Sequence, residues 1–226
     1  MIPTTNARVA GVTFLFYIAA TITSIVLFGA ATAGDGLPDR LAAIAQHATD
    51  VRLTVVISLL LSLSALVLAV TLYGITRHVD ADLALLAFAC RVAEGIGGMD
   101  VSRTLGLLWL ATAPDTSATS ALGGFFLKME GMFNASALFF AVGSLIFSSL
   151  LLRGRLVPVA LAWLGVLASL VLVGCLPLQL AGLLDDVGGF TAVARLMWYP
   201  MLVFEICLGV WLLIKGAATP STSPTA

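Results

Sequence analysis

The chain has 226 residues, of which 60% are hydrophobic and only 10% are charged. Because a soluble domain carries roughly 25% charged residues, this chain has too few charges to cover a globular surface in water. The formal net charge of −1 provides no basic surface, which argues against nucleic acid as a partner. These properties predict an integral membrane protein whose first partner is the lipid bilayer.

Six apolar stretches are long enough to cross a bilayer core, which takes about 20 residues of helix. They are residues 8–30, 52–76, 83–112, 125–152, 157–181 and 192–216. We therefore predict an all-α bundle of six transmembrane helices that forms a single domain over residues 1–216. Residues 217–226 are small, polar and interrupted by proline, and we expect this tail to be disordered.

The connectors between these stretches are short, apart from the first, at residues 34–50. There, GDGLPDR predicts a turn and LAAIAQHA a short helix in the membrane interface. With six spans, both termini and two connectors share one side of the membrane. That side carries Arg8, Arg77, Arg153, Arg155 and Lys215. The opposite side carries Arg40, Arg52 and Arg195, with Arg103 and Lys128 near its interface, together with six aspartates. This moderate bias predicts that both termini are cytoplasmic.

The end of the first stretch, ATA at residues 31–33, resembles a signal-peptidase site. The apolar run before it has about 20 residues, which is longer than the 7–15 of a signal-peptide core. A retained first span is therefore favoured. Cleavage would leave five spans.

The order of motifs along the chain resembles that of a known family. The chain begins with ARVAGVTFLFYIAA and continues with RLTVVISLLLSLSALVLAVTLYGITRHVDADLALLAFACRVAE. It then has FFAVGSLIFSSLLLRGRLVPVALAWLGVLA and ends its last helix with FEICLGVWLLIKGA. This order resembles the bacterial membrane-protein family catalogued as domain of unknown function 4386, over nearly the whole chain. The resemblance implies six spans in one domain of the bacterial inner (cytoplasmic) membrane, and it implies no reaction.

The third stretch contains the sequence CRVAEGIGGMD, with Arg91 and Glu94 inside an apolar run. A charged residue at the centre of a membrane helix costs about 2.5–3.5 kcal/mol and normally faces the interior of the bundle. The rise of about 1.5 Å per residue puts Arg91 and Glu205 near the middle of the bilayer. We predict a buried ion cluster in which Glu94 and Glu205 both pair with Arg91. Gly95 and Gly209 should let the third and sixth spans approach closely.

The cluster has two interpretations at this stage. Buried polar groups often only fix which helices are neighbours. Alternatively, two carboxylates around one arginine bind an ion, a proton or an anionic ligand, because one carboxylate exceeds what Arg91 balances. A binding site needs a cavity that reaches Glu94 or Glu205. A cluster that only fixes which helices are neighbours, which we call a structural lock, needs these groups sealed by packing.

A second group of polar residues lies near the outer end of the third and fourth stretches. Its members are Asp100, Arg103, Lys128, Glu130 and Asn134. Side chains at this depth usually extend into water. The alternative is that they form an outer vestibule above Glu94.

The sequence contains no support for an enzyme. Both histidines, His47 and His78, lie in connectors, and no hydrolase, nucleotide-binding or metal motif is present, so no metal or cofactor is expected. We favour a non-enzymatic accessory, sensing or assembly role. The alternative is a small-molecule or proton-coupled carrier with its site at Glu94 and Glu205. A second copy of the chain or another membrane protein is the expected protein partner, and the sequence does not define a small-molecule ligand.

Overall fold

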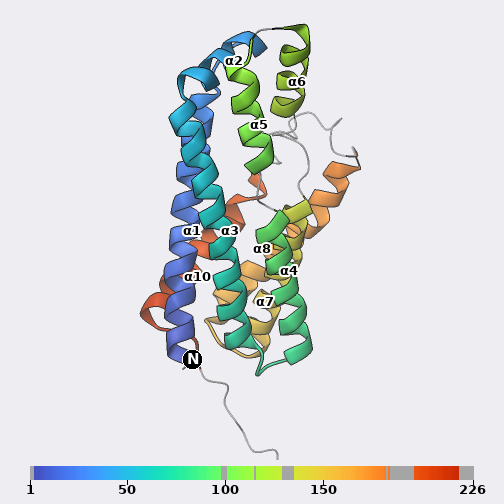
Figure 1. The fold of residues 1–226 in the computed structure, drawn as a ribbon. Helices are drawn as coiled ribbons and strands as arrows, with labels where there is room; N and C mark the ends of the chain where they lie inside the picture. The colour runs from blue at the N-terminus through green and yellow to red at the C-terminus, as the bar shows by residue number, and fades with distance from the viewer. Residues whose placement is uncertain are drawn as a thin grey trace, which may run out of the picture.

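The computed structural model describes residues 3–97, 101–114, 116–128, 135–181, 183 and 196–218. Within these ranges the regular structure is entirely α-helical (Figure 1), which confirms the predicted all-α fold. The helices are α1 (Pro3–Ala31), α2 (Leu37–Gln46), α3 (Ala48–Thr76), α4 (Ala81–Gly97), α5 (Val101–Thr112), α6 (Ser117–Lys128), α7 (Ala135–Arg153), α8 (Val159–Leu180) and α10 (Tyr199–Ile214).

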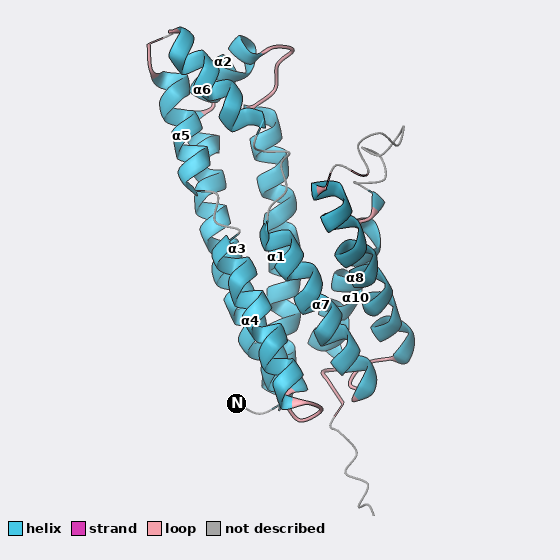
Figure 2. Cartoon of the chain, turned by 90° about the vertical axis from the view of Figure 1, so that its right-hand side faces the viewer, coloured by secondary structure: helices cyan, strands magenta, loops and turns pink. Residues whose placement is uncertain are grey.

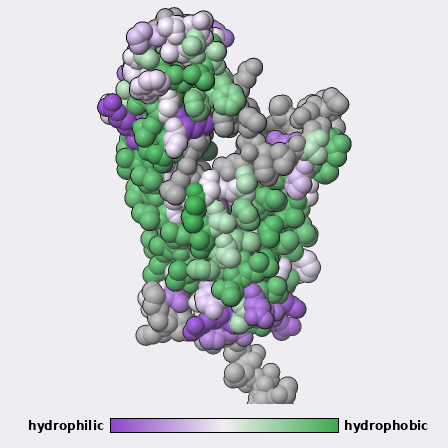
Figure 3. All heavy atoms as spheres, turned by 45° about the vertical axis from the view of Figure 1, so that its right-hand side comes forward, coloured by the Kyte–Doolittle hydropathy of each residue, from purple (hydrophilic) through white to green (hydrophobic). Residues whose placement is uncertain are grey.

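By length and composition, four described stretches of helix are able to cross a bilayer. They are Thr5–Ala31, Ala48–Thr76, Ala135–Arg153 and Val159–Gln179. The helix α10, with 16 residues, is shorter than the about 20 residues that a bilayer core requires, and the described part of α4 has 17. The face drawn in Figure 3 has a broad hydrophobic band between two ends where hydrophilic residues gather. These apolar helices are those of a membrane protein.

Two of the predicted stretches each include residues outside those that the structure describes. The third, 83–112, falls on α4 and α5, because α4 ends at Gly97 and α5 begins at Val101. The fourth, 125–152, begins inside α6 and continues in α7. The residues between α4 and α5 and between α6 and α7 lie outside those described, so one helix for each stretch stays a prediction.

Six of the described helices form a closed ring. Around it, α1 packs against α3, α3 against α4, α4 against α7, α7 against α8, α8 against α10, and α10 against α1. A large apolar core fills this ring and takes side chains from every one of the six helices. Examples, one from each helix, are Phe14, Leu72, Ala87, Phe147, Leu172 and Leu208.

The helices α2, α5 and α6 form a cap on the extended ends of α1 and α3 (Figures 1 and 2). A second apolar core holds the cap in place. Its buried members are Ala31, Ile44, Val51, Leu107, Leu108 and Leu127. The short helix predicted after GDGLPDR is α2, with Pro38 in its first turn, a position that proline favours.

Both described ends of the chain lie at the end of the ring opposite the cap. The amide of Ala218 donates a hydrogen bond of 2.9 Å to the carbonyl of Leu156, in the turn between α7 and α8. In the same region Arg153 Nη1 lies 3.7 Å from Oδ2 of Asp80, which precedes α4. Figure 1 shows the N-terminus at this end as well. We call it the terminal end, and the opposite end the cap end.

Candidate functional site

The ring encloses a buried ion cluster, formed by Arg91 and Glu94 of α4 and Glu205 of α10. Their exposed fractions are only 2%, 5% and 7%. Arg91 Nη1 donates a hydrogen bond of 2.6 Å to Glu94 Oε2, and Arg91 Nη2 lies 3.7 Å from Glu205 Oε1. The structure therefore brings together the three charged residues that the sequence singles out inside the spans.

The two carboxylates are not held equally. Glu94 has the short, charge-assisted hydrogen bond from Arg91, and it also accepts a hydrogen bond of 3.2 Å from the Tyr17 hydroxyl. The 3.7 Å contact of Glu205 is an ion pair, but it is too long for a hydrogen bond. Glu205 is thus the less engaged of the two.

The helices that carry the cluster are not neighbours. Among the described residues, α4 and α10 have no close backbone approach, so the long Arg91 side chain reaches across the ring interior. The predicted role of the two glycines was therefore wrong. Gly95 packs against α3, where Ser62 Oγ donates a 2.7 Å hydrogen bond to its carbonyl, and Gly209 packs against α1.

Aromatic rings flank the guanidinium group of Arg91. Its central carbon lies 4.9 Å from the ring centroid of Phe140 and 5.9 Å from that of Phe14. Cation–π contacts of this kind stabilise a positive charge away from water. Within the described part of the chain, Arg91 Nε has no hydrogen-bond partner.

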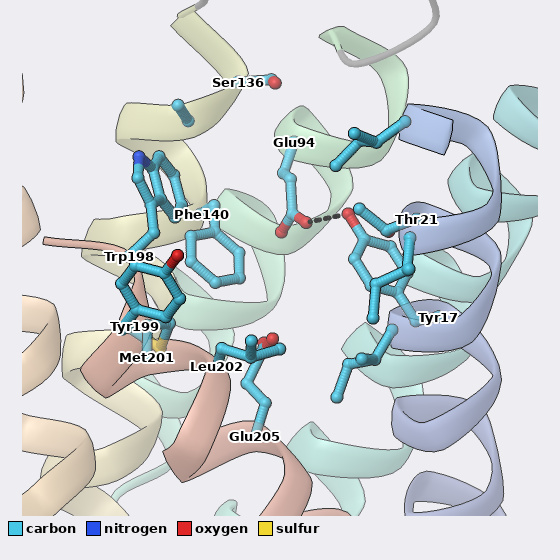
Figure 4. Close-up of a pocket in the computed structure, with 14 residues that line it drawn as sticks. Tyr17, Thr21, Glu94, Ser136, Phe140, Trp198, Tyr199, Met201, Leu202 and Glu205 are labelled. Atoms are coloured by element: carbon cyan, nitrogen blue, oxygen red, sulfur yellow. Dashed lines mark hydrogen bonds between the residues drawn. The ribbon is translucent and has the colours of Figure 1, made fainter. Parts of the chain in front are cut away.

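A cavity of about 530 Å³ lies on the cap side of the cluster. Glu94 and Glu205 both line it, and Figure 4 shows their carboxylates directed toward the same space. Most of the remaining wall is aliphatic or aromatic. The other lining residues with polar groups are Tyr17, Thr21, Ser136, Trp198 and Tyr199. The volume lies within the range of about 300–1,000 Å³ that is typical of small-molecule sites.

The ring interior on the terminal side of Arg91 is packed. The apolar side chains that fill it are Phe14, Leu72, Phe147, Leu151, Phe204 and Leu208. They leave a void of only about 10 Å³, which is near the lower limit for a single water molecule. The ion cluster therefore forms the floor of the larger cavity.

The predicted outer vestibule is only partly within the described residues. Asp100, Glu130 and Asn134 lie outside them, and so does the side chain of Lys128. Arg103 lies in the cap, 5.8 Å from the ring centroid of Phe28, and is not among the described residues that line the cavity. The outer vestibule therefore stays a prediction, and the described part of it contributes no residue to the cavity.

Several residues that line the cavity were missed by sequence reasoning. Tyr17, Thr21 and Tyr199 are common residue types in membrane helices, and nothing in the sequence assigned them to a site. Trp198 shares a helical face with Glu205 at about 100° per residue, which is a usable signal. Depth is a second one. Tyr17 lies about 14 Å along the helix from Arg8, by the rise of 1.5 Å per residue, which is close to the depth predicted for Arg91.

The described residues contain no group of three or more His, Cys, Asp or Glu side chains that could hold a metal ion. The cysteines Cys90, Cys175 and Cys207 are free thiols. The described arrangement offers ion pairing, hydrogen bonding and cation–π contact to a bound molecule.

No curated protein and no solved structure matches the chain. A family model, described as a domain of unknown function, matches residues 9–216. This range includes nearly all of the ring and the cap, and it confirms the resemblance drawn from the order of sequence motifs. The chain belongs to the family catalogued as domain of unknown function 4386.

Proposed function

We propose that this protein binds a small, largely apolar molecule in the cavity above Arg91, and that it has a sensing or accessory role in the membrane. The observation that carries this proposal is that Glu94 and Glu205 both line a cavity of about 530 Å³. A cluster that served only to fix the helices would be sealed by packing, as the ring interior is on its terminal side.

The topology that we propose has six transmembrane helices. Although α10 and the described part of α4 are short, each stands in the ring between two long helices and so crosses the same layer. The basic residues Arg8, Arg77, Arg153, Arg155 and Lys215 belong to the terminal end. The positive-inside rule assigns this end to the cytoplasm and the cap to the outer surface, which fits a bacterial inner membrane.

The number of carboxylates supports binding over a structural lock. Glu94 alone balances the charge of Arg91 through a hydrogen bond of 2.6 Å. Glu205 therefore adds a second buried negative charge, and a buried charge without a full partner costs several kcal/mol. Glu205 lies on the floor of a cavity, where a bound ligand would offset this free-energy cost.

A carrier is the second candidate function. The mid-membrane depth of the two carboxylates favours it, since transporters bind substrates and coupling ions near this depth. A carrier must also open toward both ends. The packed interior on the terminal side would have to separate for this, so we place binding without transport first.

The proposal is tested with three related probes and two variants of α1. Diphenylhexatriene is a neutral apolar dye, and its trimethylammonium and propionate derivatives are a cation and an anion. Binding to the purified protein in lipid nanodiscs is measured by energy transfer from tryptophan, because Trp198 lines the cavity. Thr21→Phe places a ring in the cavity, whereas Thr23→Phe adds the same ring to an exposed face of the same helix.

At least one probe should bind the parent protein and the Thr23→Phe variant, and should lose binding in the Thr21→Phe variant. Energy transfer that is the same in all three proteins for every probe would reflect partition into lipid. That outcome would reject the cavity as a ligand site.

A further inference from the structure

The cavity wall also indicates a class of ligand, an inference that rests on the proposed function above. We infer that the cavity takes a monovalent organic cation with an apolar body, and that the positive group binds beside Glu205. Three features of the described residues lead to this inference: the charges at the cavity floor, the aromatic rings around them and the apolar stripe above them.

The charges at the cavity floor do not balance. Arg91 and Glu94 form a neutral pair through their hydrogen bond of 2.6 Å, which leaves Glu205 with a 3.7 Å contact to the same guanidinium group. The cluster has one positive and two negative groups when both carboxylates are ionised. A single positive charge beside Glu205 makes the cluster neutral. A net charge is most costly in free energy where water is scarce.

The same wall disfavours an anion. No lysine or arginine is among the described residues that line the cavity, because Arg91 lies behind the two carboxylates. Among the described residues, an anionic ligand would therefore meet Glu94 and Glu205 before a positive group. Such like-charge contact in a site of low polarity is strongly unfavourable.

Aromatic side chains surround the place where the positive group would bind. Figure 4 shows Phe140, Trp198 and Tyr199 on one side of the two carboxylates and Tyr17 on the other. The faces of aromatic rings attract cations within about 6 Å, and ammonium groups are commonly recognised in this way. Phe140 already makes such a contact with Arg91.

The upper wall of the cavity fits an apolar body. The lining residues of α1 run from Tyr17 to Ile25 and include Ile18 and Ile22. At a rise of 1.5 Å per residue, this stripe is about 12 Å long. A bound molecule would therefore lie along α1, with its charged group at the floor and its apolar part toward the cap end.

A proton on Glu205 would balance the cluster equally well, so a cation and a proton compete for this carboxylate. The other described titratable or charged groups at the site are Tyr17 of α1, Arg91 and Glu94 of α4, and Tyr199 of α10. The described lining residues of α7 are uncharged, and α3 and α8 contribute none. Cation binding should therefore weaken as the pH falls, while binding of a neutral molecule should not.

The three diphenylhexatriene probes test this inference on the parent protein, without any dependence on the folding of a variant. The trimethylammonium probe should bind about tenfold more tightly than the neutral probe, or better, and the propionate probe should not bind measurably. Glu205→Gln should remove the preference for the cation over the neutral probe. Thr21→Phe should abolish binding of the cation, and Thr23→Phe should retain it.

Two results would overturn the inference, and they have different meanings. If the neutral or the anionic probe binds as tightly as the cation, and Thr21→Phe abolishes this binding, the ligand class is wrong but the cavity remains a binding site. If Thr21→Phe changes the binding of no probe, the proposed function itself fails.

Discussion

The terminal half and the cap half of the ring are built differently around one charged cluster. On the terminal side, a Cβ atom added to Gly11 of α1 would lie 2.6 Å from the carbonyl oxygen of Gly209 in α10. On the cap side, the same two helices line a cavity of about 530 Å³. Because the chain can pack α1 and α10 closely, the cavity is not a consequence of loosely packed helices.

Residue size accounts for this difference. At the terminal end, glycines on both helices let the backbones approach, as small residues do at helix contacts within membranes. Toward the cap end, the facing positions carry Tyr17 on α1 and Tyr199 on α10, which are too large for such an approach. The sequence therefore closes the ring at one end and holds it open at the other.

The largest expected effect comes from Arg91→Met, which removes the only positive group described at the boundary between the two halves. It leaves Glu94 and Glu205 buried without a cation, and removal of one partner of a buried ion pair typically costs about 3–5 kcal/mol. We expect a loss of that size in the free energy of unfolding, measured by denaturant titration of the protein in detergent.

The matched control is Glu205→Gln, which leaves the neutral Arg91–Glu94 pair intact. We expect it to change the free energy of unfolding by less than about 1 kcal/mol. If Glu205→Gln were as damaging as Arg91→Met, and the double variant recovered stability, the cluster would be a structural lock.

The second effect concerns the cap, which has an apolar core of its own. Leu107 is fully buried in that core, and Leu107→Ala should destabilise the cap by about 2–5 kcal/mol. Hydrogen exchange should increase in α2, α5 and α6, while the ring helices keep their protection. Leu105→Ala on the same helix is the control, because Leu105 is 42% exposed. Increased exchange throughout the ring would show that the two cores unfold together.

The third effect concerns the closed half of the ring. Gly11→Ala forces a methyl group against the backbone of α10, and overpacking of this kind costs about 1–3 kcal/mol. Gly29→Ala is a control on the same helix, because nothing lies within 4 Å of the added methyl group. Thermal unfolding should show a lower midpoint for Gly11→Ala only. Equal midpoints would mean that α1 and α10 are not closely packed there.

Sequence reasoning found the buried charges but not their surroundings, for a physical reason. Arg91, Glu94 and Glu205 stand out because each charge in a membrane helix needs a partner. Apolar residues carry no such signal, since lipid and the protein core are both apolar. On α3, Leu72 is buried in the core whereas Val70 is 55% exposed, and nothing in their chemistry separates them. The faces that pack, and hence the cavity, therefore emerge only from the arrangement of all six helices.

The smallest expected effect on stability belongs to Thr21→Phe, although its effect on binding is the largest. Within the described residues the buried Thr21 hydroxyl has no hydrogen-bond partner, so its loss breaks no such bond. Filling a cavity commonly stabilises a protein by about 0.5–2 kcal/mol, and we expect a gain at the lower end of that range.

Thr23→Phe should leave the free energy of unfolding unchanged, because Thr23 lies on an exposed face of α1. If Thr21→Phe instead destabilised the protein as strongly as Gly11→Ala, the two halves of the ring would be packed alike. A gain in stability together with a loss of probe binding would mean that the chain keeps this space open at the expense of its own stability. A loss of stability in exchange for an open cavity is expected of a binding site and not of a structural lock.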